Sequence, residues 1–163
     1  KAVSTLAILQ NTPLLAALFS IFFAQFVKIP IHFLMTRKLD WSLFTSTGGM
    51  PSSHSAAVTS LCTAIAFETG LDSTLFAVAT VFAVIVMFDA TGVRFQAGQQ
   101  AIMINQMRLD FQLFVEQTKE WSHKKNDEKL EELKTLLGHK PIEVFMGAIT
   151  GILISIIIYN FLL

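Results

Sequence analysis

Hydrophobic residues gather in four long stretches of the chain, separated by shorter polar segments. The stretches run from about residue 13 to 35, from 53 to 69, from 73 to 93, and from 141 to the last residue. About 20 mostly apolar residues allow a helix to cross a lipid bilayer. Asn11 and Pro13 are suited to begin the first helix, and Gly70 and Asp72 separate the second from the third. The pattern therefore predicts about four transmembrane helices.

The segment between the third and fourth stretches is too polar to contact lipid. Within residues 96–116, however, Ile104, Met107, Phe111 and Phe114 recur at steps of three and four, the spacing of an amphipathic helix. A polar turn at about 122–127 and a shorter stretch with regularly spaced leucines follow. We expect a helical hairpin, inserted over about residues 96–137, at the membrane surface. A contact in a homodimer and ordinary packing within the bundle are the alternatives for the same apolar stripe.

Composition agrees with a single membrane domain. The chain has 163 residues, 53% hydrophobic and 15% charged, and its mean hydropathy of +0.57 exceeds that of ordinary soluble domains. The formal net charge is zero, so no bulk field favours nucleic acid as a partner. The predicted fold class is all-α: a polytopic membrane helical bundle forming one integral membrane domain over residues 1–163.

Polar and titratable residues converge on one face of this bundle. If the four helices cross the membrane in turn, the ends of the first and third lie on the same face as the beginnings of the second and fourth. That face receives Lys28, Arg37, Lys38, Ser52, Ser53, His54, Asp89, Arg94, His139 and Glu143. Such convergence of phosphate-binding and titratable groups at one depth indicates a functional site. Every Lys and Arg except Lys1 also lies there, so the positive-inside rule predicts that this is the cytoplasmic face of the cell membrane.

The segment from Gly48 to Ser55 is the most informative motif. Serines 52 and 53 at the start of a helix leave backbone N–H groups directed outward, where the helix dipole favours an anion. A histidine at that point, His54, can donate a proton to a leaving oxygen. Taken alone, the motif is also compatible with a serine helix cap beside an incidental histidine.

His139 and Glu143 form a second motif, four residues apart at the beginning of the last helix. This spacing places both side chains on one side of the helix, so the carboxylate can fix the tautomer of the imidazole. An oriented neutral imidazole can attack phosphorus. The alternative is that Glu143 only complements the N-terminus of the helix.

Three cations, Lys28, Arg37 and Arg94, are candidates to neutralise phosphoryl oxygens. Taken alone, Lys28 and Arg37 are more typical of interface residues that extend their charges out of the membrane. Asp89 lies deep in an apolar stretch and is expected to pair with Arg94 or Lys28. A metal role for Asp89 has no ligand spacing to support it.

Together these residues resemble the phosphatidic acid phosphatase type 2 superfamily, which includes the vanadium haloperoxidases. That superfamily has a Lys–Arg element, a Pro-Ser-Gly-His element, and an arginine followed by histidine and aspartate. The matching residues here are Lys28 with Arg37, Pro51-Ser52-Ser53-His54, and Arg94 with His139 and Glu143. The whole chain is similar to the divergent bacterial and plant branch, the YuiD-like membrane proteins.

The chain departs from the superfamily pattern at several points. Ser53 replaces the glycine, Glu143 replaces the aspartate, and Lys38 follows Arg37 where the pattern has proline. The hairpin also separates Arg94 from His139.

The resemblance implies a metal-independent lipid phosphate phosphatase without a cofactor, whose partners are a lipid phosphate and membrane lipids. His139 would be the nucleophile and form a phosphohistidine, His54 would be the general acid and then the base, and Glu143 would hold His139. The phosphate would be bound by Lys28, Arg37, Ser52, Ser53 and Arg94, with Asp89 in support. The alternative function is a non-catalytic membrane protein that binds anionic phosphate headgroups. Two histidines with a partner carboxylate favour the enzyme, because binding alone needs only the cations.

Overall fold

The computed structural model describes residues 8–46, 48–117 and 138–162, and within these ranges the chain is helical without strands. The helices are α2 (Thr12–Thr36), α3 (Ser53–Thr69), α4 (Thr74–Thr91), α5 (Val93–Gln117) and α6 (Pro141–Ile157). A short 3-10 helix, η1 (Trp41–Thr45), precedes α3, and a π-helical turn, η3 (Ile158–Leu162), ends the described chain. Each of the four predicted apolar stretches forms a helix, which confirms the predicted membrane helical bundle.

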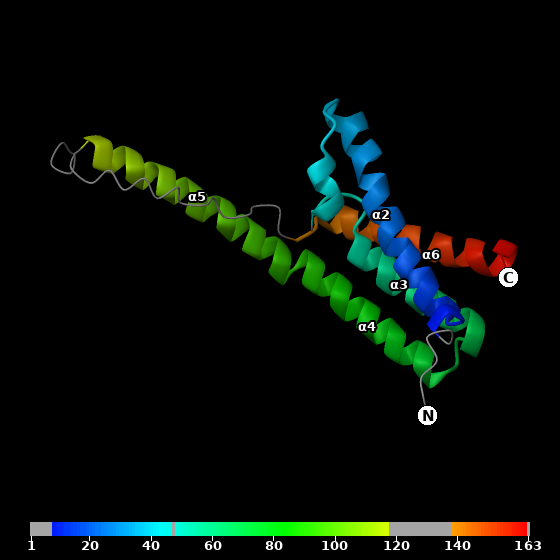
Figure 1. Cartoon of the computed structure of the whole chain (residues 1–163). Coiled ribbons are helices and arrows are strands. Elements are labelled where there is room, and N and C mark those ends of the chain that lie inside the picture. Colours follow the sequence, from blue (N-terminus) through cyan, green and yellow to red (C-terminus); the bar gives the residue numbers. More distant parts are fainter. Residues whose placement is uncertain (1–7, 47, 118–137, 163) are drawn as a thin grey trace.

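Helix α3 lies in the centre of the bundle, in contact with α2, α4 and α6 (Figure 1). In the described chain three segments are long and apolar enough to cross a membrane: Thr12–Thr36, Thr74–Phe114 and Pro141–Phe161. Helix α3 has 17 residues and is rich in serine, threonine and alanine. Its length corresponds to about 26 Å, slightly less than the hydrocarbon thickness of a bilayer. The more polar α3 is therefore enclosed by the more apolar helices.

The distribution of small and large side chains in the bundle is typical of a membrane protein. Its buried positions are mostly small residues, such as Ala16, Ala24, Ala56 and Ser60. The large apolar side chains are on the outside, including many of the phenylalanines of α2 and valines of α4. Small residues let membrane helices approach closely, and lipid tails cover the large side chains.

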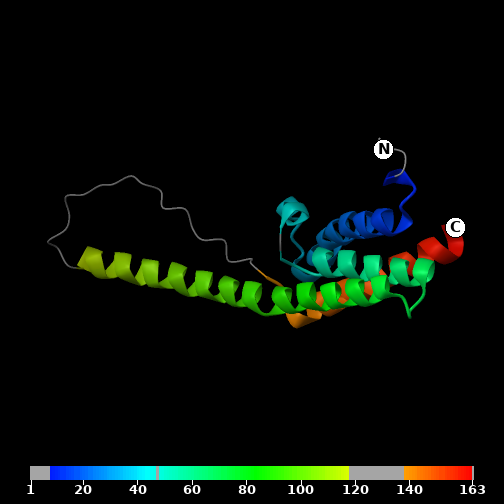
Figure 2. The same cartoon turned by 90° about the horizontal axis from the view of Figure 1, so that it is seen from below.

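Helix α5 follows α4 almost without interruption and continues in the same direction beyond the rest of the bundle (Figures 1 and 2). It is the first helix of the predicted hairpin. The predicted turn and second helix of the hairpin fall within residues 118–137, outside the described residues. The location of α5 at the membrane surface stays a prediction.

One end of the bundle collects the predicted site residues. The start of α2 and the end of α6 lie at the other end, whereas the end of α4 meets the beginning of α6 (Figures 1 and 2). A hydrogen bond from the His139 backbone N to the Ala90 O, 3.0 Å, joins these two segments. The Ser52 N donates to the Glu143 O at 2.9 Å and joins the beginnings of α3 and α6.

Candidate active site

A cavity of about 360 Å³ lies where α3 and α6 begin and where α4 passes into α5. Four of the predicted site residues line it: His54, Asp89, Arg94 and His139. The rest of its wall is apolar or backbone, from Ile85, Val86, Ala90, Ala97 and Gly138. The helix order thus brings together groups that are up to 85 residues apart in sequence, from His54 to His139.

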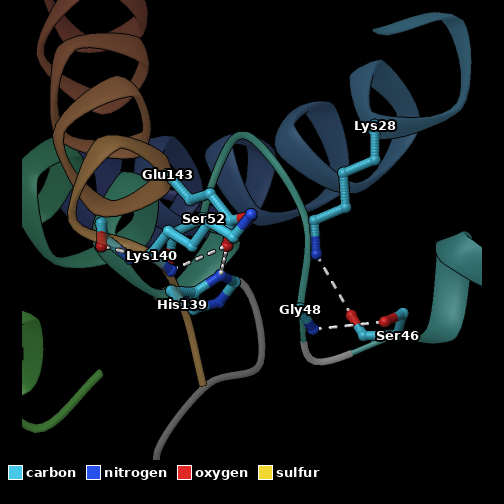
Figure 3. Close-up of polar contacts among 8 residues, drawn as sticks. Lys28, Ser46, Gly48, Ser52, His139, Lys140 and Glu143 are labelled. Carbon is cyan, nitrogen blue, oxygen red and sulfur yellow. Dashed lines mark hydrogen bonds and ion pairs between the residues drawn. The ribbon is translucent and has the colours of Figure 1, made fainter. Parts of the chain in front are cut away.

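His139 forms the buried end of this cavity, with 2% of its surface exposed. Its Nδ1 lies 3.1 Å from the Glu143 Oε2, as predicted from their spacing (Figure 3). A carboxylate accepts hydrogen bonds, so Nδ1 carries the proton, and in the neutral ring Nε2 then keeps a free lone pair. Nε2 is buried and has no hydrogen-bond partner among the described residues. Because it is on the ring side opposite Nδ1, it is directed away from Glu143.

Glu143 combines the two roles considered for it. The same Oε2 also accepts a hydrogen bond from the Lys140 backbone N at 3.1 Å, and so caps the beginning of α6 (Figure 3). This bond satisfies one of the free N–H groups of the helix start. The helix cap therefore also fixes the carboxylate that orients His139.

His54 is the second residue of α3 and is exposed, in contrast to His139. The centroids of the two rings are 6.2 Å apart and their planes are inclined by 61°. One group of the size of a phosphate can contact both rings. The exposed ring can exchange protons with water, and the buried ring is held in one orientation.

Asp89 is paired with Arg94, one of the two cations considered for it. The Arg94 Nε donates to the Asp89 Oδ2 at 2.6 Å, and the two side chains are 59% and 41% exposed. This contact uses the Nε of the guanidinium and leaves its two terminal nitrogens for an anion. In the described chain, no three His, Cys, Asp or Glu side chains are close enough together to hold a metal ion.

Ser52 and Ser53 are buried and line neither this cavity nor the second one described below. The Ser52 Oγ accepts a hydrogen bond from the Ser55 N at 3.3 Å and caps α3. In this structure the serine motif therefore forms the start of the helix that carries His54. Its role in binding phosphate stays a prediction.

Lys28 does not line the cavity of the two histidines but a second cavity of about 430 Å³ between α2, the loop before α3, and α6. Its side chain is buried, and its Nζ donates to the Ser46 O at 3.1 Å (Figure 3). Glu143 lines this second cavity and attracts the Lys28 ammonium. Asp40 lines it too, and hydrogen bonds from Ser42 hold the pKa of the Asp40 carboxyl below its ordinary value.

Arg37 is not brought to either cavity. It is exposed and ends α2 in a left-handed conformation with φ of 58°, where its N donates to the Phe33 O at 2.8 Å. The predicted cations are thus divided in this structure: Arg94 lines the cavity of the histidines, Lys28 lines the second cavity, and Arg37 lines neither.

Sequence reasoning missed the glycines that hold the site together. A Cβ at Gly151 would collide with the Ala56 O and the Thr59 Oγ1, and a Cβ at Gly147 with the Ser52 O. The close approach of α6 to α3 allows the Thr59 Oγ1 to donate to the Ala148 O at 3.0 Å. Two glycines four residues apart in an apolar stretch are a recognised signal for close helix packing.

Gly138 was also missed, and its backbone decides where His139 lies. Its φ is +81°, which side-chain-bearing residues rarely adopt, and a Cβ there would collide with the backbone of Arg94 and Phe95. The chain can therefore pass over the α4–α5 junction before His139 only with glycine at this position.

We expect Gly151→Ala to destabilise the bundle by about 1–3 kcal/mol, because α6 must move away from the Ala56 carbonyl to accommodate the methyl group. Unfolding in detergent measures this effect. Leu153→Ala is the control, because Leu153 is on the same helix and is 53% exposed. Equal stability of Gly151→Ala and the wild type would contradict the packing described here.

Comparison with known proteins agrees with the resemblance seen in the sequence. Residues 9–154 match the divergent PAP2 family, which is nearly the whole chain. The chain belongs to this family. It is also 58% identical over 154 residues to the uncharacterized membrane protein YuiD of Bacillus subtilis (strain 168), covering 94% of this chain and 98% of that protein. No solved structure matches the chain.

Proposed function

We propose that this protein is a membrane lipid phosphatase that hydrolyses a phosphomonoester or diphosphate headgroup through a phosphohistidine intermediate. The observation that carries the proposal is the state of His139. Its Nδ1 is held by Glu143, its Nε2 has no partner among the described residues, and its ring lines a cavity shared with His54 and Arg94. Membership of the divergent PAP2 family supports the same chemistry.

In the first step the Nε2 lone pair of His139 attacks phosphorus, and the bond from phosphorus to the ester oxygen breaks. Protonated His54 gives its proton to the departing alkoxide, which leaves as an alcohol. The positive charge that develops on His139 is stabilised by Glu143, whose carboxylate already accepts its Nδ1 proton.

In the second step a water molecule attacks the phosphorus of the phosphohistidine. His54, now neutral, takes a proton from this water, and the bond from phosphorus to Nε2 breaks. Inorganic phosphate leaves, and His139 and His54 return to their initial protonation states. The exposed position of His54 suits this step, because the base must reach water.

Positive charge for the phosphoryl oxygens comes mainly from Arg94, whose terminal nitrogens are not used by Asp89. Lys28 adds positive potential from the other side of Glu143. Arg37, Ser52 and Ser53 are candidates through the sequence motifs and the family resemblance, and none of them lines either cavity. We infer, from the distribution of Lys and Arg, that the site faces the cytoplasm.

Purified protein in detergent should release phosphate from at least one member of a panel of lipid phosphates. The release should continue in EDTA, because protein cations neutralise the phosphate, and vanadate should inhibit it as an analogue of five-coordinate phosphorus. Free phosphate is the measurement. Activity that disappears with EDTA and returns with magnesium would contradict the scheme. Lipid binding without phosphate release from any ester would indicate the headgroup-binding function.

A further inference from the structure

The cavity that contains His139 is open on its apolar side. His139 and Ala90 form its closed end, 2% and 3% exposed, whereas Ile85 is 60% exposed although it lines the same cavity. A side chain that lines a cavity and is mostly exposed lies at the opening. The cavity therefore opens past Ile85, in addition to the polar rim formed by Asp89 and Arg94.

This opening is at the level of the lipid tails. Ile85 precedes Asp89 by four residues, so it is about 6 Å deeper in the apolar part of α4. Its neighbours Val84 and Phe88 are also exposed, at 56% and 76%. Exposed apolar side chains on a membrane-spanning helix are covered by lipid, so the cavity is continuous with the bilayer on this side.

We propose that this side opening admits the substrate directly from the bilayer, with Ile85 and Val86 contacting the carbon chain next to the phosphate. The inference rests on the proposed phosphatase function. The phosphate reaches His139 and Arg94 while the chain remains among lipid tails, so no apolar surface is transferred to water.

A bulky residue at the opening tests this proposal. We expect Ile85→Trp to lower kcat/KM for dioleoyl phosphatidate in vesicles, relative to kcat/KM for water-soluble p-nitrophenyl phosphate, by roughly tenfold. The lipid chain must pass the enlarged side chain, and the small ester can approach past the polar rim. Val84→Trp is the matched control, because Val84 is adjacent, apolar and exposed but does not line the cavity. In Val84→Trp the ratio of kcat/KM for the lipid ester to kcat/KM for the soluble ester should equal that of the wild type.

The result separates this proposal from the proposed function. An unchanged ratio in Ile85→Trp, or an equal fall in Val84→Trp, would overturn the side opening while wild-type turnover still supports the phosphatase. Absence of phosphate release from both esters by the wild type would instead remove the function on which the proposal rests.

Discussion

Replacing His139 by alanine should abolish phosphate release, with a loss of more than about 10³-fold in kcat. The variant has no nitrogen that can attack phosphorus in the buried end of the cavity, and therefore forms no covalent phosphate. Phosphate release and mass spectrometry of the protein under alkaline conditions, which preserve phosphohistidine, measure the two effects. In the wild type the covalent phosphate should map to His139.

Two further variants show whether the loss of phosphate release comes from the missing nucleophile and not from weaker lipid binding or a general effect of removing a histidine. Glu143→Gln should retain lipid binding but slow turnover, because an amide gives no negative charge to the imidazole while Arg94 is unchanged. His32→Ala is the matched histidine control. His32 lines the second cavity and not that of His139, and its Nδ1 lies 3.3 Å from the Thr36 hydroxyl of its own helix. Near-normal phosphate release by His139→Ala would refute the nucleophile assignment.

The helical bundle could be predicted from the sequence because hydropathy shows which segments are apolar enough to enter the membrane and where those segments end. The contact of His139 with Glu143 was also predictable, because four residues is one helical turn and both lie at a helix start. The interior position of α3 was less evident. Its frequent serines and threonines exclude extensive contact with lipid, but they do not say which helices cover it.

The place of Lys28 could not be predicted, because it depends on a loop and not on a periodic pattern. Its ammonium is held by the carbonyl of Ser46, a backbone atom about which side-chain identity says little. The same applies to Gly138, whose positive φ becomes necessary only when the chain passes close to Arg94 and Phe95. Contacts made by irregular backbone thus decide how the predicted residues are divided between the two cavities.

His54→Ala should lower turnover of a lipid phosphate by about 10²–10⁴-fold, the usual range for loss of a general acid–base group. The alkoxide must then leave without a proton, and water must attack without a base. Both steps are slowed, but the nucleophile is intact and still held by Glu143. His54→Ala should therefore still form the covalent phosphate at His139, which His139→Ala cannot form.

An ester with a good leaving group distinguishes the two histidines. With p-nitrophenyl phosphate the departing phenolate needs no proton, so the first step in His54→Ala should be partly restored while the second remains slow. Phosphohistidine should then accumulate at His139 and appear as a burst of nitrophenolate without a matching release of phosphate. The double variant His54→Ala/His139→Ala, which has no nucleophile, is the control and should give no burst. An equal loss on lipid and activated esters, with no covalent phosphate, would show that His54 does not act as the acid. The exposed ring 6.2 Å from His139 would then contribute to the shape of the cavity and not to proton transfer.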